Sequence, residues 1–166
     1  CPHCGWNLEG EKDSVVLLCR NCVSAWEAFK GRFRRVDLMA LPDRFGKATY
    51  LPFWRISSRV RGVEMRSFAD FVRATKQPVV PKSEWEDQDM RFWIPAFKVR
   101  PKIFLDLARR LTCSPDEEAE SSDSLPRDGI FPVPLPGAEA VQSMKISLAG
   151  AAMNKREILP SLPEVR

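Results

Sequence analysis

Four cysteines near the start of the chain have the types and spacing of a metal site. Cys1 and Cys4 form one CxxC pair, Cys19 and Cys22 form a second, and fourteen residues separate the two pairs. A CxxC pair on a tight turn points both sulfurs at one position, and two such turns supply the corners of a tetrahedron. Zn²⁺ takes four thiolates in this geometry at about 2.3 Å and has no redox chemistry of its own. We therefore expect Zn²⁺ bound by these four cysteines.

The same thiols leave two alternatives to zinc, namely disulfides and an iron or iron–sulfur site. The separation of the pairs is marginally shorter than the spacing common in such zinc sites. If sulfur fills all four positions around the metal, no position stays open for water or substrate, so we expect a structural ion. Its binding energy would then be folding energy for a segment of about 25 residues, which is too short to hold a core unaided.

Residues 1–26 resemble the zinc-ribbon superfamily. The resemblance rests on the two CxxC pairs, on Gly5 after the first pair, and on a hairpin-like segment between them, with a turn at 10–13 and an apolar strand at 14–18. It implies a small three-stranded β unit whose third strand follows the second pair, and we interpret residues 26–36 as that last strand and the exit from it. Zinc ribbons occur in nucleic-acid machinery and in protein-assembly modules alike, so the resemblance does not choose a function.

The composition indicates a folded chain. Of the 166 residues 44% are hydrophobic, and ten Phe and five Trp suffice for a packed core. No apolar run is long enough to span a membrane, and no signal peptide is visible. The chain begins at Cys1 rather than Met, so we expect a segment upstream of it. Four thiols in CxxC pairs and a fifth, Cys113, favour a reducing compartment, and we expect a cytoplasmic protein.

We expect two domains, a zinc ribbon at residues 1–36 and an α+β domain at 37–166 with an acidic loop near 114–128. Strands and helices alternate in the second, which predicts a mostly antiparallel sheet with helices packed on one face. Apolar periodicity and capping residues place the elements. They are strands at 50–61 and 90–99, a helix capped by Ser67, a helix from Pro101 with Ile103, Phe104, Leu107, Ala108 and Leu111 on one stripe, and a helix at 138–153.

The charges are unevenly distributed. Residues 1–29 carry two basic and four acidic side chains, residues 30–110 nineteen and nine, and residues 111–166 five and nine. A basic middle between acidic ends suits a polyanionic partner or the protein's own acidic segment. Alternation in the 50–61 strand puts three arginines on one face, which could track a phosphate backbone or simply be the wet face of a sheet. The candidate polyanion-binding residues are Arg32, Arg34, Arg35, Arg55, Arg59 and Arg61.

The residues that could catalyse a reaction are few and scattered. His3 is the only histidine and lies inside the first CxxC pair, Tyr50 is the only tyrosine, and Cys113 follows a hydrophobic helix with no second histidine to activate it. No Gly-rich phosphate loop occurs. We therefore expect no catalytic residues, no enzyme activity and no small-molecule substrate.

Two functions fit these features. The first is a non-catalytic zinc-ribbon adaptor that docks on a protein partner within a larger assembly, since Trp, Phe and Arg dominate interface energetics. The alternative is a nucleic-acid-binding protein that uses the arginine-rich strand face and the ribbon. Steeply salt-dependent oligonucleotide binding would distinguish the second from the first.

Overall fold

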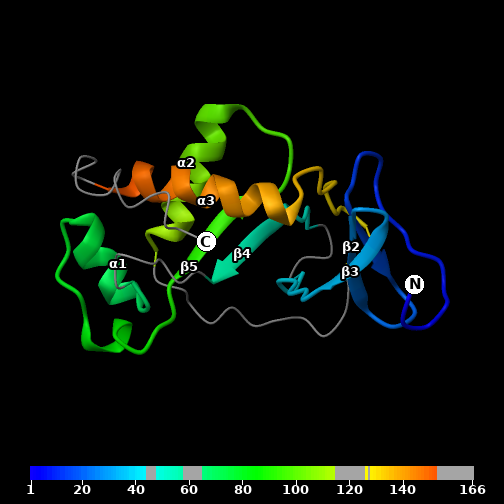
Figure 1. The fold of residues 1–166 in the computed structure, drawn as a ribbon, viewed down its shortest axis with the longest axis horizontal. Coiled ribbons are helices and arrows are strands. Elements are labelled where there is room, and N and C mark those ends of the chain that lie inside the picture. The colour runs from blue at the N-terminus through cyan, green and yellow to red at the C-terminus, as the bar shows by residue number, and fades with distance from the viewer. Residues whose placement is uncertain (44–47, 58–64, 115–125, 127, 153–166) are drawn as a thin grey trace. The chain divides into compact units, whose positions relative to one another are not determined.

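The structure is a computed structural model that describes residues 1–43, 48–57, 65–114, 126 and 128–152. Among these residues it contains three α-helices and two antiparallel sheets, so the α+β class is confirmed (Figure 1). The chain divides into two compact units. The first comprises Cys1–Pro52, Ala96–Lys98 and Glu118–Pro136, and the second comprises Phe53–Pro95, Val99–Glu117 and Gly137–Arg166. The domain boundary at residue 36 stays a prediction.

The first unit is built on a three-stranded antiparallel sheet. Its strands are β1 (Val16–Cys19), β2 (Ser24–Phe29) and β3 (Arg32–Val36), in the order β1-β2-β3. The turn between β1 and β2 carries the second CxxC pair, so the register that places Cys19 opposite Ser24 also fixes the position of that turn.

The third strand corrects the interpretation of residues 26–36 as one last strand. Lys30 and Gly31 form a two-residue turn with φ values of 48° and 74°, and Phe29 pairs with Arg32 across it. Two central residues with positive φ match the right-handed twist of a β-hairpin. The chain therefore reverses at Lys30, and the strand after Cys22 is the second of the sheet. Lys-Gly is a weaker hairpin signal than Asn-Gly, which explains why the sequence pattern alone did not separate the two strands.

The outer edge of β1 is covered by other parts of the first unit. Glu9 and Leu18 exchange backbone hydrogen bonds of 2.8 and 2.7 Å. The Val15 amide donates to the Val133 carbonyl at 2.8 Å, and the Val133 amide donates to the Ser14 hydroxyl at 3.1 Å. Two stretches far apart in sequence thus close this edge of the sheet.

The second unit contains a two-stranded antiparallel sheet of β4 (Phe53–Ser57) and β5 (Arg91–Pro95). The alternation predicted for the first of these strands is confirmed, because Trp54 and Ile56 are half-buried whereas Arg55 and Ser57 are exposed. The strand begins at Phe53 rather than at residue 50. Tyr50 instead forms an isolated parallel bridge with Ile130 in the first unit, and residues 58–64 lie outside the described residues.

Helices and one short 3₁₀ turn complete the second unit (Figure 1). The helices are α1 (Phe68–Thr75), α2 (Pro101–Thr112) and α3 (Gly137–Ala151), and the 3₁₀ turn η1 spans Ser83–Trp85. The helix predicted at 138–153 is confirmed, with Met144 and Leu148 buried. No helix in the described ranges is long and apolar enough to cross a membrane. The buried hydrophobic core consists of Met65, Phe68, Phe71, Val72, Met90, Phe92, Met144, Leu148, Ala151 and Ala152.

Helix α2 confirms the middle of the predicted apolar stripe, since Ala108 is buried and Phe104 and Leu107 are half-buried, and it corrects the two ends. Ile103 and Leu111 are 46% and 37% exposed, whereas Ala108 and Thr112 are buried. The Thr112 hydroxyl accepts a 3.1 Å hydrogen bond from the Trp93 amide, which points away from β4. This bond satisfies an amide on the free edge of β5 and turns the Ala108–Thr112 face of the helix inward. A search for apolar residues at helical spacing could not find a face that ends in a threonine.

Helix α1 begins with a reciprocal cap. The Asp70 amide donates to the Ser67 hydroxyl at 3.1 Å, and the amides of Ser67 and Arg66 donate to the Asp70 carboxylate at 3.1 and 3.0 Å. Partial burial by itself would raise the pKa of Asp70. The two amide hydrogen bonds, assisted by the charge of Arg73, outweigh it and lower the pKa below the ordinary value.

We expect the Asp70 cap to stabilise the fold only while the carboxylate is ionised. A pKa lowered in the folded state contributes stability above the unfolded value of about 3.9, and this contribution is lost as the pH falls through the folded value. Asp70→Asn should therefore be less stable than the parent at pH 7, and the difference should shrink as the pH falls from about 5 to 2. Urea titrations of both proteins across this range measure the difference, and an unchanging difference would contradict the prediction.

Candidate metal centre

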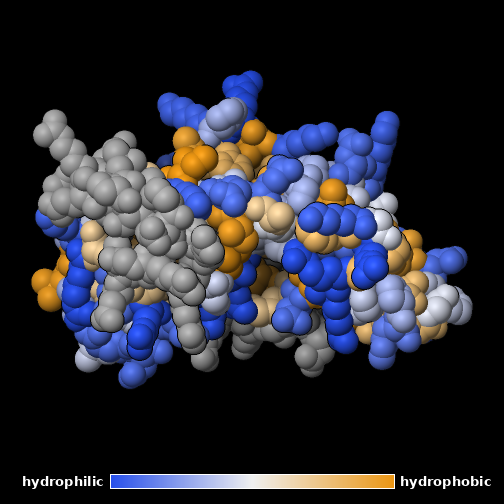
Figure 2. Space-filling model, in the orientation of Figure 1, coloured by the Kyte–Doolittle hydropathy of each residue, from blue (hydrophilic) through white to orange (hydrophobic). Residues whose placement is uncertain are grey.

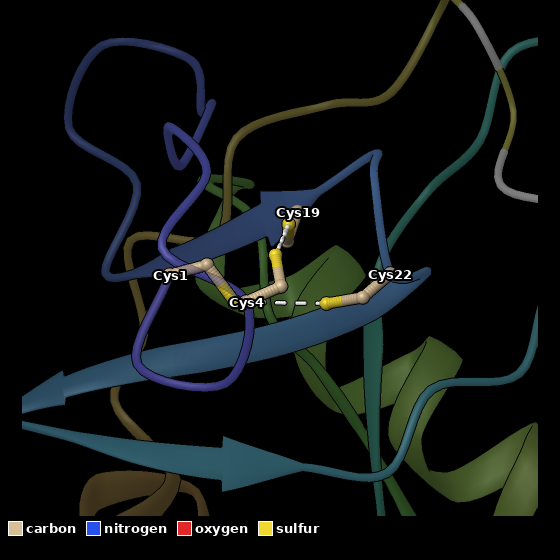
Figure 3. Close-up of side chains that lie close together, drawn as sticks. All are labelled: Cys1, Cys4, Cys19 and Cys22. Carbon is tan, nitrogen blue, oxygen red and sulfur yellow. Dashed lines mark hydrogen bonds between the residues drawn. The ribbon is translucent and has the colours of Figure 1, made fainter.

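The four sulfurs of the two CxxC pairs converge on one point (Figure 3). The Sγ atoms of Cys4 and Cys19 lie 3.4 Å apart, those of Cys1 and Cys22 lie 3.6 Å apart, and all four lie within 4.8 Å of one another. A tetrahedron with metal–sulfur bonds of about 2.3 Å has sulfur–sulfur edges of roughly 3.8 Å. A disulfide needs about 2.05 Å. The four cysteines thus form a cluster of the size that holds a metal ion such as zinc.

Local backbone geometry aims each pair at that point. In the first pair the Gly5 amide donates to the Cys1 carbonyl at 2.8 Å, and Gly5 has a φ of 75°, which suits a residue without a Cβ. In the second pair Cys19 is the last residue of β1 and fully buried, and Cys22 lies in the turn that leads into β2. A loop and a hairpin turn thus each supply two sulfurs.

Val23 occupies the position after the second pair that Gly5 occupies after the first. Its φ is 49°, which is costly for a β-branched residue, and its side chain is 50% exposed, so it gains little from burial. The two turns thus share one backbone shape, but only the first has the residue that adopts this shape without strain.

We expect Val23→Gly to stabilise the protein by about 1 kcal/mol, because it removes a left-handed strain of about 1–2 kcal/mol and the greater freedom of the unfolded glycine offsets part of the gain. Thermal unfolding of the metal-loaded protein measures the change. Gly5→Val is the mirror experiment and should destabilise by a similar amount. A destabilising Val23→Gly would mean that the Val23 side chain makes contacts worth more than its backbone strain.

A buried serine connects the sulfurs to the sheet. The Ser24 hydroxyl lies 3.0 Å from the Sγ of Cys22 and 3.9 Å from that of Cys1, and it accepts a 2.8 Å hydrogen bond from the Trp26 indole. Because the indole can only donate, the single hydroxyl proton of Ser24 is left for a sulfur. Cys22 is the nearer acceptor, so this chain of hydrogen bonds favours a thiolate there. Sequence reasoning missed Ser24, whose only signal is its place two residues after a cysteine ligand.

We expect Ser24→Ala to weaken metal binding about 10- to 100-fold, the usual effect of losing a hydrogen bond to a metal ligand. The substitution also leaves the buried Trp26 indole without its acceptor. Ser24→Thr keeps the hydroxyl and serves as the control. Competition with a chromophoric zinc chelator measures both affinities, and equal affinities for Ser24→Ala and the parent would contradict this role.

The thiols of the cluster differ in pKa. Hydrogen bonds from the Asn21 side chain and the Trp6 amide lower the pKa of Cys4 to about 7. At Cys22 the hydrogen bond from Ser24 acts to lower the pKa, but burial and the neighbouring thiols of Cys19 and Cys4 raise it overall. The pKa of Cys4 thus lies near neutrality, whereas that of Cys22 is raised. A divalent cation bound by all four sulfurs would favour the thiolate form of each, because its charge would offset the repulsion between neighbouring thiolates.

The fifth cysteine stands apart from the cluster. Cys113 ends α2 and packs against the core of the second unit, and its burial raises the pKa of the thiol. A raised pKa keeps the thiol protonated at neutral pH and makes it a weak nucleophile.

The three candidate basic residues of β3 lie on two faces of its sheet. On β3, Arg32 and Arg34 point to one face of the sheet and Arg35 to the other, because side chains alternate along a strand. Arg34 forms an ion pair with Glu27, which is fully buried, and its guanidinium lies 5.3 Å from the centre of the Phe29 ring.

In the second unit Arg55 is exposed and lies 5.9 Å from the centre of the Trp93 ring. Trp93 in turn makes an edge-to-face contact with Phe53 at 6.4 Å. Arg59 and Arg61 lie outside the described residues. The described part of the predicted arginine face is thus one arginine beside two aromatic rings.

The two tryptophans of the first unit differ in exposure. Trp26 is 8% exposed, whereas Trp6 is 59% exposed. Comparison with models of known protein families, with curated proteins and with solved structures returns no match. The function is therefore inferred from the residues and their geometry.

Proposed function

We propose that this protein is a non-catalytic adaptor in which a structural Zn²⁺ holds a small β-sheet that docks on a protein partner within a larger assembly. The observation that carries the proposal is the convergence of all four cysteine sulfurs within 4.8 Å of one another. Four sulfur ligands complete the coordination of zinc, so the ion would have no position for water or a substrate and would serve folding.

Charge placement supports a protein partner over nucleic acid. A phosphate backbone is bound by several cations on one continuous surface. On β3 the three arginines are divided between two faces, and Arg34 is engaged by Glu27. The exposed Phe33 lies on the same strand, and Phe and Arg together are typical of protein interfaces.

Nucleic-acid binding is the second candidate, and one observation favours it. Arg55, Trp93 and Phe53 lie on one face of the β4–β5 sheet. An exposed guanidinium beside aromatic rings is the combination on which single-stranded bases stack.

One experiment separates the two functions. The metal-loaded protein is titrated with a fluorescent single-stranded oligonucleotide at about 50 and 200 mM salt, where nucleic-acid binding would weaken steeply. The adaptor proposal predicts no binding at either concentration. Salt-sensitive binding that disappears in an Arg55→Ser variant would overturn the proposal in favour of the second candidate.

Two further measurements test the adaptor directly. Elemental analysis should find one zinc per chain, and iron in its place would refute the zinc assignment. A partner that copurifies with the native protein should then re-form a complex of fixed stoichiometry from purified components. Turnover of a substrate by the purified protein would overturn the non-catalytic role.

A further inference from the structure

The outer edge of β3 presents unpaired backbone groups. Phe29 and Arg32 close the two-residue turn, and pairing with β2 then alternates along the strand, so the amides and carbonyls of Phe33 and Arg35 point away from β2. No described residue forms a backbone hydrogen bond with either of them on that side. All residues of β3 except Val36 are exposed. This edge therefore offers two donors and two acceptors.

The opposite edge of the same sheet shows how an edge is closed in this protein. Glu9 and Val133 supply backbone partners to β1, and Ser14 adds a hydroxyl. Within the described residues β3 has no comparable cover. A free edge of this kind is a template for a further strand.

The side chains of β3 decide which kind of strand fits. Arg32 and Arg35 make no ion pair with any described residue, whereas Arg34 is paired with Glu27. Phe33 is 47% exposed and shares a face with Arg35. The surface over β3 is predominantly hydrophilic (Figure 2). An incoming strand would thus meet one unpaired positive charge on each face and an apolar side chain on one of them.

We propose that the outer edge of β3 binds an extended acidic segment of the partner protein as a fourth strand of the sheet. This inference rests on the adaptor function proposed above and names its docking surface. Backbone hydrogen bonds to Phe33 and Arg35 hold the segment, and its carboxylates meet Arg32 and Arg35.

Two other occupants fit this edge poorly. A second copy of β3 would place arginine rows against each other, and like charges on adjacent strands repel. A nucleic-acid backbone offers phosphate oxygens, which can accept hydrogen bonds from the two amides. These oxygens cannot donate a hydrogen bond to the outward carbonyls of Phe33 and Arg35. A peptide backbone satisfies donors and acceptors together.

The test uses the metal-loaded full chain and a phage-displayed library of random nine-residue peptides. We expect the enriched peptides to carry two Asp or Glu residues an odd number of positions apart among β-branched residues, because such positions lie on opposite faces of a strand, as Arg32 and Arg35 do. Hydrogen–deuterium exchange should show the Phe33 and Arg35 amides protected when such a peptide binds, while the Arg34 amide, which faces β2, changes little.

Arg35→Pro tests the backbone contact, because proline removes an amide that β2 does not use. Arg35→Ala is the matched control that loses the charge but keeps the amide. We expect the proline variant to bind the selected peptide at least about tenfold more weakly than the alanine variant, which corresponds to about 1.4 kcal/mol for the lost hydrogen bond. One zinc per chain in both variants shows that the ribbon is intact. If the proline variant does not bind zinc, hydrogen–deuterium exchange of the parent protein with and without the peptide tests the proposal instead.

Several outcomes would overturn the inference. They are failure to enrich any peptide, selected peptides without acidic residues, equal binding by the proline and alanine variants, and unprotected Phe33 and Arg35 amides in the complex. A reconstituted partner complex that is indifferent to Arg35→Pro would reject the β3 edge and leave the adaptor function standing. Binding of a single-stranded oligonucleotide with no peptide enriched would reject both.

Discussion

Removal of the metal is expected to unfold the three-stranded sheet of the first unit. The strands bury only a few side chains, among them Cys19, Ala25 and Trp26, which is too little apolar surface to hold a sheet of this size. Structural zinc in comparable small domains contributes an apparent binding free energy of about 10–16 kcal/mol at neutral pH, and nearly all of it is folding energy. Excess chelator should therefore abolish the exchange protection of the β1, β2 and β3 amides, and added Zn²⁺ should restore it.

Substitution of the buried ligand should have the same effect as the chelator. Cys19→Ser replaces a thiolate with a hydroxyl that is a poor zinc ligand, and the remaining three sulfurs cannot complete the tetrahedron. Cys113→Ala is the matched control, because it removes a thiol that lies outside the cluster and should leave one zinc per chain. Sheet amides that stay equally protected with and without metal would show that the ion is not structural.

The cluster of four cysteines could be predicted from the sequence because its geometry is local. Each CxxC pair sits on one short turn, so four residue identities and two spacings were enough to place the sulfurs. The hydrogen bond from Ser24 to Cys22 was not visible in the same way. It depends on the side-chain conformations of Cys22, Ser24 and Trp26, which residue spacing alone does not give.

The interpretation of the arginines depended on register even more strongly. Neighbouring arginines can be assigned to opposite faces of a strand only when the strand's first and last residues are known. The sequence pattern did not show that the Lys30–Gly31 turn divides residues 26–36 into two strands. The pairing of Glu27 with Arg34 requires the hairpin, because these residues lie directly opposite each other across it. Of the three arginines of β3, Arg34 is thus paired with Glu27, whereas Arg32 and Arg35 make no ion pair with the residues that the structure describes.

The elements predicted for the second unit agree better with the structure, because the residues that mark the start of a helix lie next to it in the sequence. Ser67 before Phe68 and proline at the start of α2 each mark a helix end without reference to the rest of the fold. The inward face of α2 was predicted in part, since Ala108 is buried as expected, but Thr112 rather than Leu111 ends that face, and its hydroxyl contacts the Trp93 amide 19 positions away. Local signals fix where an element begins, and distant partners fix how it is rotated.

Truncation of Phe92 is expected to cost the second unit about 3–5 kcal/mol, the range found for buried Phe→Ala changes. Phe92 is fully buried on β5, and its ring meets that of Phe71 from α1 edge to face, with centroids 6.2 Å apart. Both rings belong to the core that also contains Met144 and Leu148 of α3. Since the substitution empties a position where strand and helices meet, the surrounding side chains can refill little of the space.

Exchange protection of the β5 and α1 amides, measured with zinc saturating, reports the loss in this unit without a contribution from metal binding. Phe33→Ala is the control, because that ring is 47% exposed and its removal should cost well under the loss at Phe92. A Phe92→Ala variant within about 1 kcal/mol of the parent would mean that α1 and α3 close over the vacated position. In that case the second unit would be held mainly by its backbone hydrogen bonds and caps rather than by the aromatic pair.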